Sequence, residues 1–133
     1  MGVFMLGALL AGAATVWWLR GDGGVKLGDI AGYAAGSVVY RSTDGFFVVR
    51  LPDGQVLAIS DVDPHNPPGR RSCLVTFRPD LKQDGEVGRF FDACTGSAYG
   101  LEGRGQSGDG LDLRHIRVER REDGGLTAWP GGS

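Results

Sequence analysis

Apolar residues fall into one long run and then into many short ones. Fifteen of the first nineteen residues are apolar, and no charged side chain occurs before Arg20. From residue 37 onward, short β-branched and aromatic stretches alternate with clusters of glycine, proline, aspartate and serine. None of these stretches keeps a helical period for more than about two turns, which favours strands. The pattern predicts an apolar N-terminal helix followed by an all-β domain.

Turn residues divide the polar part of the chain into about eight short strands, as in small antiparallel sandwiches or barrels. The predicted strands cover 37–41, 46–51, 55–60, 74–78, 89–91, 98–99, 113–119 and 126–127. Phe46 to Ser60 is typical of a hairpin, because the Asp53-Gly54 pair can adopt the positive φ angles of a tight turn. We therefore predict a small antiparallel sandwich or barrel.

The apolar leader has the length of a single membrane span. Nineteen helical residues extend roughly 28 Å, close to the 30 Å hydrocarbon core of a bilayer. Trp17, Trp18 and Arg20 then provide interfacial aromatics and a charge. A cleavable signal peptide is the alternative, since 11–13 is a small-residue Ala-Gly-Ala site, but no Lys or Arg precedes the apolar run.

Four segments follow from these patterns. We predict a transmembrane anchor in the lipid bilayer at 1–20, a linker at 21–25, a β domain at 26–128 and a tail at 129–133.

Composition excludes several classes of protein. The chain has 133 residues, 24 of them glycine, and its 14 basic and 16 acidic residues give a net charge of −2. The length fits one domain, and the charge balance argues against a nucleic-acid partner. Only two histidines are present, and no serine has the His and Asp partners of a catalytic triad. We expect the protein not to be an enzyme.

Two loops resemble those of Rieske [2Fe–2S] domains. Residues 56–65 resemble the strand that enters the first cluster loop, and 91–104 resemble the second loop and the strand after it. The most specific element is Gly-Ser-x-Tyr-x-Leu-x-Gly-Arg at 96–104, shortly after a cysteine. The resemblance runs from about Val25 to Thr127 and implies a Rieske-like fold.

The cluster ligands of that family are largely missing. A Rieske cluster takes two thiolates and two imidazoles, which the family places as Cys-x-His and Cys-x-x-His. The corresponding positions here hold Asp63 and His65 in the first loop and Asp92 and Thr95 in the second. Carboxylates and hydroxyls replace soft thiolates poorly, so we expect no cluster and no other cofactor. An alternative is a mononuclear metal site at Asp63, His65 and Asp92, while a rigid turn is the simpler interpretation.

Cys73 and Cys94 match the positions at which many Rieske proteins carry a disulfide between the two loops. The resemblance therefore implies this bridge, which favours an oxidising compartment. The basic residues Arg20, Lys26 and Arg41 follow the leader, and the positive-inside rule would place the domain in the cytoplasm. The two arguments conflict, and we expect the domain on the outer, periplasmic or extracellular, side of the cell membrane.

Together these expectations describe a membrane-anchored Rieske-like accessory subunit of a respiratory or photosynthetic electron-transport complex. Its partners would be the other subunits of that complex, with a cytochrome bc-type or terminal oxidase assembly as the host suggested by the family.

Overall fold

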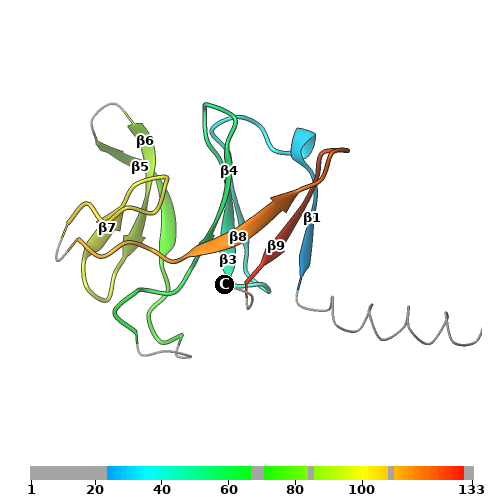
Figure 1. Cartoon of the computed structure of the whole chain (residues 1–133). Coiled ribbons are helices and arrows are strands. Elements are labelled where there is room, and N and C mark those ends of the chain that lie inside the picture. Colours follow the sequence, from blue (N-terminus) through cyan, green and yellow to red (C-terminus); the bar gives the residue numbers. More distant parts are fainter. Residues whose placement is uncertain (1–23, 67–70, 84–85, 108–109, 131–133) are drawn as a thin grey trace, which may run out of the picture.

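Two antiparallel β-sheets form the part of the chain that the computed structural model describes, residues 24–66, 71–83, 86–107 and 110–130 (Figure 1). In spatial order the larger sheet contains β1 (Val25–Asp29), β9 (Gly125–Trp129), β8 (His115–Arg120), β4 (Val56–Ser60), β3 (Phe46–Arg50) and β2 (Val38–Arg41). The smaller sheet contains β5 (Thr76–Gln83), β6 (Glu86–Asp92) and β7 (Ser97–Tyr99). A short 3-10 helix, η1 (Ile30–Gly32), follows β1. The prediction of an all-β antiparallel domain is confirmed.

The first and last strands lie near the ends of the described residues. Strand β1 begins at Val25 and β9 ends at Trp129. The transmembrane helix predicted for 1–20 lies outside the described residues. Within the described ranges, no helix has the length and apolar character needed to cross a membrane.

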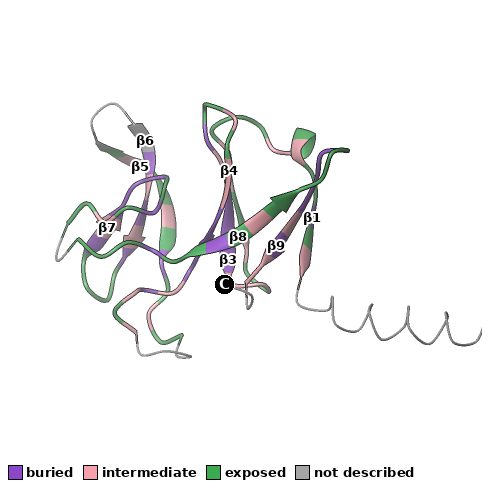
Figure 2. Ribbon diagram, in the orientation of Figure 1, coloured by how far each residue is buried: buried purple, intermediate pink, exposed green. Residues whose placement is uncertain are grey.

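Strand β3 is buried on both faces and separates two hydrophobic cores. Phe46 and Val48 pack into one core with residues of β1, β8 and β9. Phe47 and Val49 point the other way, into the core shared with the smaller sheet. Because side chains alternate along a strand, a continuous apolar run fits only a strand covered on both sides. Figure 2 shows this buried strand at the centre of the molecule.

The smaller sheet packs against β3 through aromatic rings. The ring centroids of Phe47 and Phe90 lie 4.8 Å apart, and those of Phe90 and Phe77 lie 5.5 Å apart. This packing places the connection between β4 and β5 next to the turn between β6 and β7. Those two connections contain the sequence-predicted site.

Candidate functional site

The first site loop leaves β4 with its acidic side chains turned inward. Asp63 is only 2% exposed, and its backbone N–H donates to the carbonyl of Cys73 over 3.0 Å. The backbone N–H of His65 donates to Asp63 Oδ1 over 2.8 Å, and that oxygen lies 2.6 Å from His65 Nδ1. This carboxylate therefore organises the turn around itself, as aspartates do in Asx-turns.

In the second site loop, too, a buried aspartate accepts hydrogen bonds from the residues that follow it. Asp92 ends β6 and is fully buried. Its Oδ1 accepts from the Cys94 backbone N–H over 2.9 Å, and its Oδ2 lies 2.8 Å from Thr95 Oγ1. Gly96 closes the turn with a φ of 74°, a conformation that costs glycine least.

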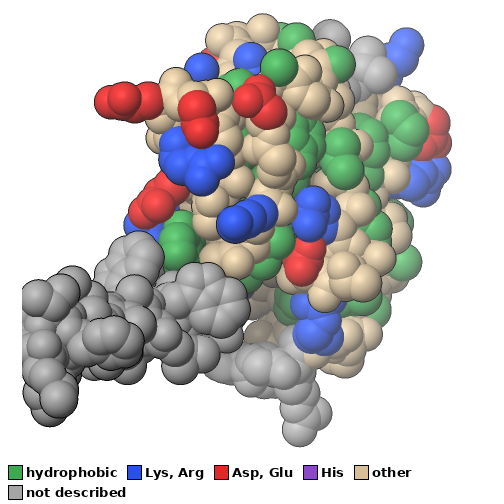
Figure 3. Space-filling view, turned by 90° about the vertical axis from the view of Figure 1, so that its right-hand side faces the viewer, with side chains coloured by type: hydrophobic (Ala, Val, Ile, Leu, Met, Phe, Trp, Pro, Cys, Tyr) green, Lys and Arg blue, Asp and Glu red, His purple; other side chains and the backbone are tan. Residues whose placement is uncertain are grey.

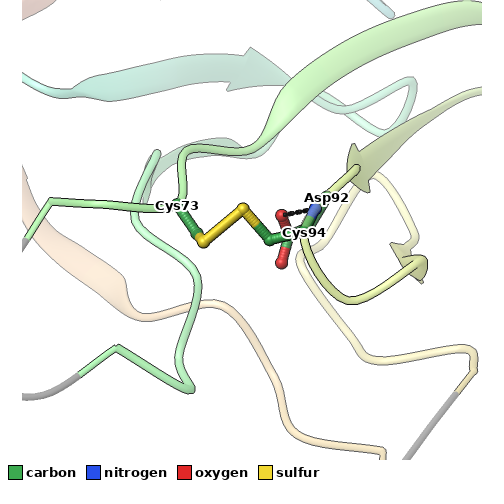
Figure 4. Close-up of side chains that lie close together, drawn as sticks. All are labelled: Cys73, Asp92 and Cys94. Atoms are coloured by element: carbon green, nitrogen blue, oxygen red, sulfur yellow. Dashed lines mark hydrogen bonds between the residues drawn. A yellow bond between two sulfur atoms is a disulfide. The ribbon is translucent and has the colours of Figure 1, made fainter.

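The two loops meet through a disulfide, which lies beside Asp92 (Figure 4), and through a pair of carboxyl groups. Cys73 and Cys94 are bonded, with Cα atoms 6.1 Å apart, within the range that a disulfide spans. The Asp63 and Asp92 carboxyl groups are hydrogen-bonded to each other. All four positions that match Rieske ligands are thus linked in one chain of hydrogen bonds.

Burial and hydrogen bonding shift the pKa values of the two carboxyl groups in opposite directions. Burial opposes ionisation of Asp63, but hydrogen bonds from Asp92 and from the backbone and ring of His65 outweigh it and lower its pKa. Burial and the hydrogen bond with Asp63 raise the pKa of Asp92. Asp63 is therefore the member of the pair that ionises more readily, and Asp92 is the member that favours its protonated form.

These donors do not fit a Rieske cluster. Such a cluster needs two thiolates and two imidazoles, whereas the matching positions supply two carboxyl groups, one imidazole and one hydroxyl. The sulfur atoms of Cys73 and Cys94 lie near Asp92, and these ligand atoms are within 4.8 Å of one another. Since the two sulfur atoms are bonded to each other, they offer no thiolate while the disulfide is intact.

A third buried acid, which lies beside the first loop, was not predicted as a site residue from the sequence. Asp61 is fully buried, and its Oδ2 accepts from Tyr40 Oη over 2.7 Å and from Arg71 Nη2 over 2.8 Å. The hydrogen bond with Asp61, burial and the charge of Asp61 together raise the pKa of Tyr40. The three residues lie 21 and 10 positions apart, so no local pattern could have indicated this contact.

Other polar groups considered from the sequence lie apart from this centre. His115 is an exposed residue of β8, and its Nε2 lies 2.6 Å from the carbonyl oxygen of Glu102. Both residues line a shallow hollow of about 300 Å³ with Arg104, Asp112 and Leu113. Asp80 pairs with Arg78 on the surface over 2.6 Å. The described residues in these places show no catalytic arrangement.

No family model and no curated protein matches the chain. One similar solved structure is a proposed NADH-dependent nitrite reductase small subunit from Mycobacterium tuberculosis, at 15% identity and a TM-score of 0.46, covering 79% of this chain and 92% of that one. Another is a proposed nitrite reductase NADPH small subunit, at 17% identity and a TM-score of 0.43, covering 79% and 96%. Similarity at this level establishes neither a shared fold family nor a shared function.

Proposed function

We propose that the protein is a membrane-anchored Rieske-like accessory subunit of a respiratory or photosynthetic electron-transport complex, without an iron–sulfur cluster of its own. The observation that carries the proposal is the contact between Asp63 and Asp92. At the two positions where Rieske domains carry thiolate ligands, this chain has buried carboxyl groups, which are hydrogen-bonded to each other across the two loops. The domain then acts by packing on other subunits rather than by carrying electrons.

Analysis of iron and acid-labile sulfide in the full chain, purified from membranes with its partners, tests the proposal. We expect the chain itself to contribute neither, and to co-purify with redox subunits. A cytochrome bc-type or terminal oxidase assembly is the host that the family resemblance suggests. Stoichiometric iron and sulfide bound to this chain, with a Rieske electron paramagnetic signal, would contradict the proposal.

A mononuclear metal site is the second candidate, because Asp63 lies in contact with the His65 ring and with Asp92. Carboxylate and imidazole donors suit several divalent metals. Titration of the full chain with Zn²⁺ and Mn²⁺, beside the H65A variant, separates the candidates. Binding at one equivalent that is lost in H65A supports the metal site, and absence of binding supports the structural role.

The disulfide supports placing the domain outside the cytoplasm, since such bonds rarely persist there. Alkylation of intact cells, followed by reduction and a second label, tests this placement. We expect Cys73 and Cys94 to take the second label only after reduction. Labelling of both cysteines before reduction would contradict an outer location.

A further inference from the structure

The chain enters the domain beside Trp129. Gly24, the residue before β1, packs so closely against the indole that a Cβ placed on it would lie 2.9 Å from a ring carbon. At the next position, Val25 pairs with Ala128 of β9. Leu19 is the last residue of the apolar leader and lies five positions before Gly24. Extended chain of that length spans at most about 18 Å, so a leader in a bilayer would hold this end of the sheet close to the lipid surface.

The strands at this end turn one face away from the core. Ile116, Leu126 and Ala128 are buried in the core of the larger sheet. Because neighbouring side chains alternate, Arg117 of β8 and Trp129 of β9 face outward. These two residues are paired across the strands, and the Arg117 guanidinium lies 5.3 Å from the centre of the indole ring.

Charge differs between the two ends of strands β1, β8 and β9. Among the described residues, the end beside Trp129 carries three basic residues and one acidic residue, namely Lys26, Arg114, Arg117 and Glu119. The opposite end carries two basic and three acidic residues, namely Arg120, Arg121, Asp29, Glu122 and Asp123. Figure 3, which views the molecule from this side, shows most acidic side chains in the upper half, whereas basic side chains occur at the top as well as over the middle and lower part.

The basic end has the chemistry of an interfacial surface. Trp129 is half-buried, and Arg114 Nη1 donates to the carbonyl of Pro130 over 3.2 Å, so the basic groups surround the end of β9. Tryptophan with adjacent Lys and Arg is typical of protein surfaces at the headgroup level. Basic residues near an anionic leaflet are attracted to it.

We propose that this basic end, formed by Lys26, Arg114, Arg117 and Trp129, lies against anionic phospholipid headgroups. The inference rests on the proposed anchor at 1–20 and adds a second, electrostatic contact with the membrane. That contact orients the domain, so that the loops carrying Asp63 and Asp92 have a fixed orientation relative to the bilayer and to neighbouring subunits.

Fluorescence of the full chain in lipid nanodiscs tests the contact. The W17F/W18F variant leaves Trp129 as the only tryptophan of three. Its emission is compared with and without a phospholipid that carries a nitroxide on its headgroup, in zwitterionic and in anionic discs. We expect about twofold stronger quenching in the anionic discs, because the basic side chains draw this end of the sheet to the membrane surface.

Charge reversal at the two ends provides matched variants. K26E/R114E, added to the same background, changes two basic residues that do not include the indole's partner Arg117, and it should abolish the extra quenching in anionic discs. R120E/R121E makes the same change of charge at the opposite end and should leave the quenching unaltered. Equal loss in both variants, or no quenching of Trp129 in any disc, would overturn the inference.

Extraction with alkaline carbonate distinguishes failure of the inference from failure of its premise. If the full chain leaves the membrane in carbonate, the proposed anchor is wrong. If the chain stays in the membrane but Trp129 is not quenched, the anchor stands and only the headgroup contact is wrong.

Discussion

At the scale of single residues, the two carboxyl groups of the site perform different tasks. Asp63 accepts hydrogen bonds from the backbone of His65 and from Asp92, and it lies in contact with the His65 ring. Burial and the hydrogen bond with Asp63 raise the pKa of Asp92, so its neutral form is favoured. Replacing Asp63 by a neutral residue should therefore lower the stability of the fold strongly, whereas the same replacement of Asp92 should lower it little, although both side chains are buried.

We expect D63N to lower the free energy of unfolding by about 2–3 kcal/mol, because buried donors lose a charged acceptor. D92N should cost under about 1 kcal/mol, since the amide can donate to the Asp63 carboxylate in place of the shared proton. Urea unfolding at neutral pH measures both. Equal losses in the two variants would contradict the assignment of the charge to Asp63.

The same assignment predicts how stability depends on pH. The pKa of Asp92 is raised in the folded state, so its contribution is complete below the unfolded value of about 3.9 and is lost as pH rises through the folded value. The pKa of Asp63 is lowered, so its contribution is present above about 3.9 and is lost as pH falls through the folded value. We expect D92N to remove part of the decline in stability on the alkaline side of pH 4. If the free energies of unfolding of the wild type and D92N change with pH in parallel across that range, a raised pKa at Asp92 is excluded.

At the scale of the elements, β3 connects the two cores. Phe46 and Phe47 are adjacent, but they are buried in different cores at 0% and 2% exposure. We expect F46A and F47A each to cost about 3–5 kcal/mol, because each leaves a cavity in a closed core. V39A on the neighbouring strand β2 is the control, since Val39 is 41% exposed. A small effect at either phenylalanine, measured by urea unfolding, would show that β3 is covered on one face only.

The two site loops are also joined covalently. Cys73 and Cys94 are separated by 21 positions, and a bridge over a loop of that size contributes about 3 kcal/mol in the chain-entropy account. We expect a reducing agent to lower the stability of the wild type to that of C73S/C94S and to leave the variant unchanged. Insensitivity of the wild type to reduction, with the bridge shown to be open, would contradict the contribution of the disulfide.

Sequence patterns predicted these elements unevenly. The run Phe46–Val49 could be assigned as a strand because four successive aromatic and β-branched residues favour a buried strand without help from distant contacts. Strand β1 was not predicted, because Gly28 interrupts it and its register with β9 shifts between Lys26 and Gly28. The meeting of Asp63 with Asp92 followed only from the family resemblance. The contacts of Asp61 depend on packing between distant segments, so local sequence carries no signal for them.

At the scale of the whole molecule, the strongest test of the Rieske resemblance is to restore its ligands. D63C/D92C/T95H recreates the Cys-x-His and Cys-x-x-His pattern in loops that the Cys73–Cys94 disulfide already holds together. If the loops retain the family geometry, the purified full-length variant should take up a [2Fe–2S] cluster, seen as visible absorption and a Rieske electron paramagnetic signal.

D63C/D92C, which keeps Thr95, is the matched control, because it supplies both thiolates but only one of the two imidazoles. It should not give the Rieske signal. A triple variant that folds like the wild type by circular dichroism but binds no iron would mean that these loops do not hold the cluster geometry. In that case the contact between Asp63 and Asp92 would belong to an ordinary β-domain turn rather than to a former redox centre.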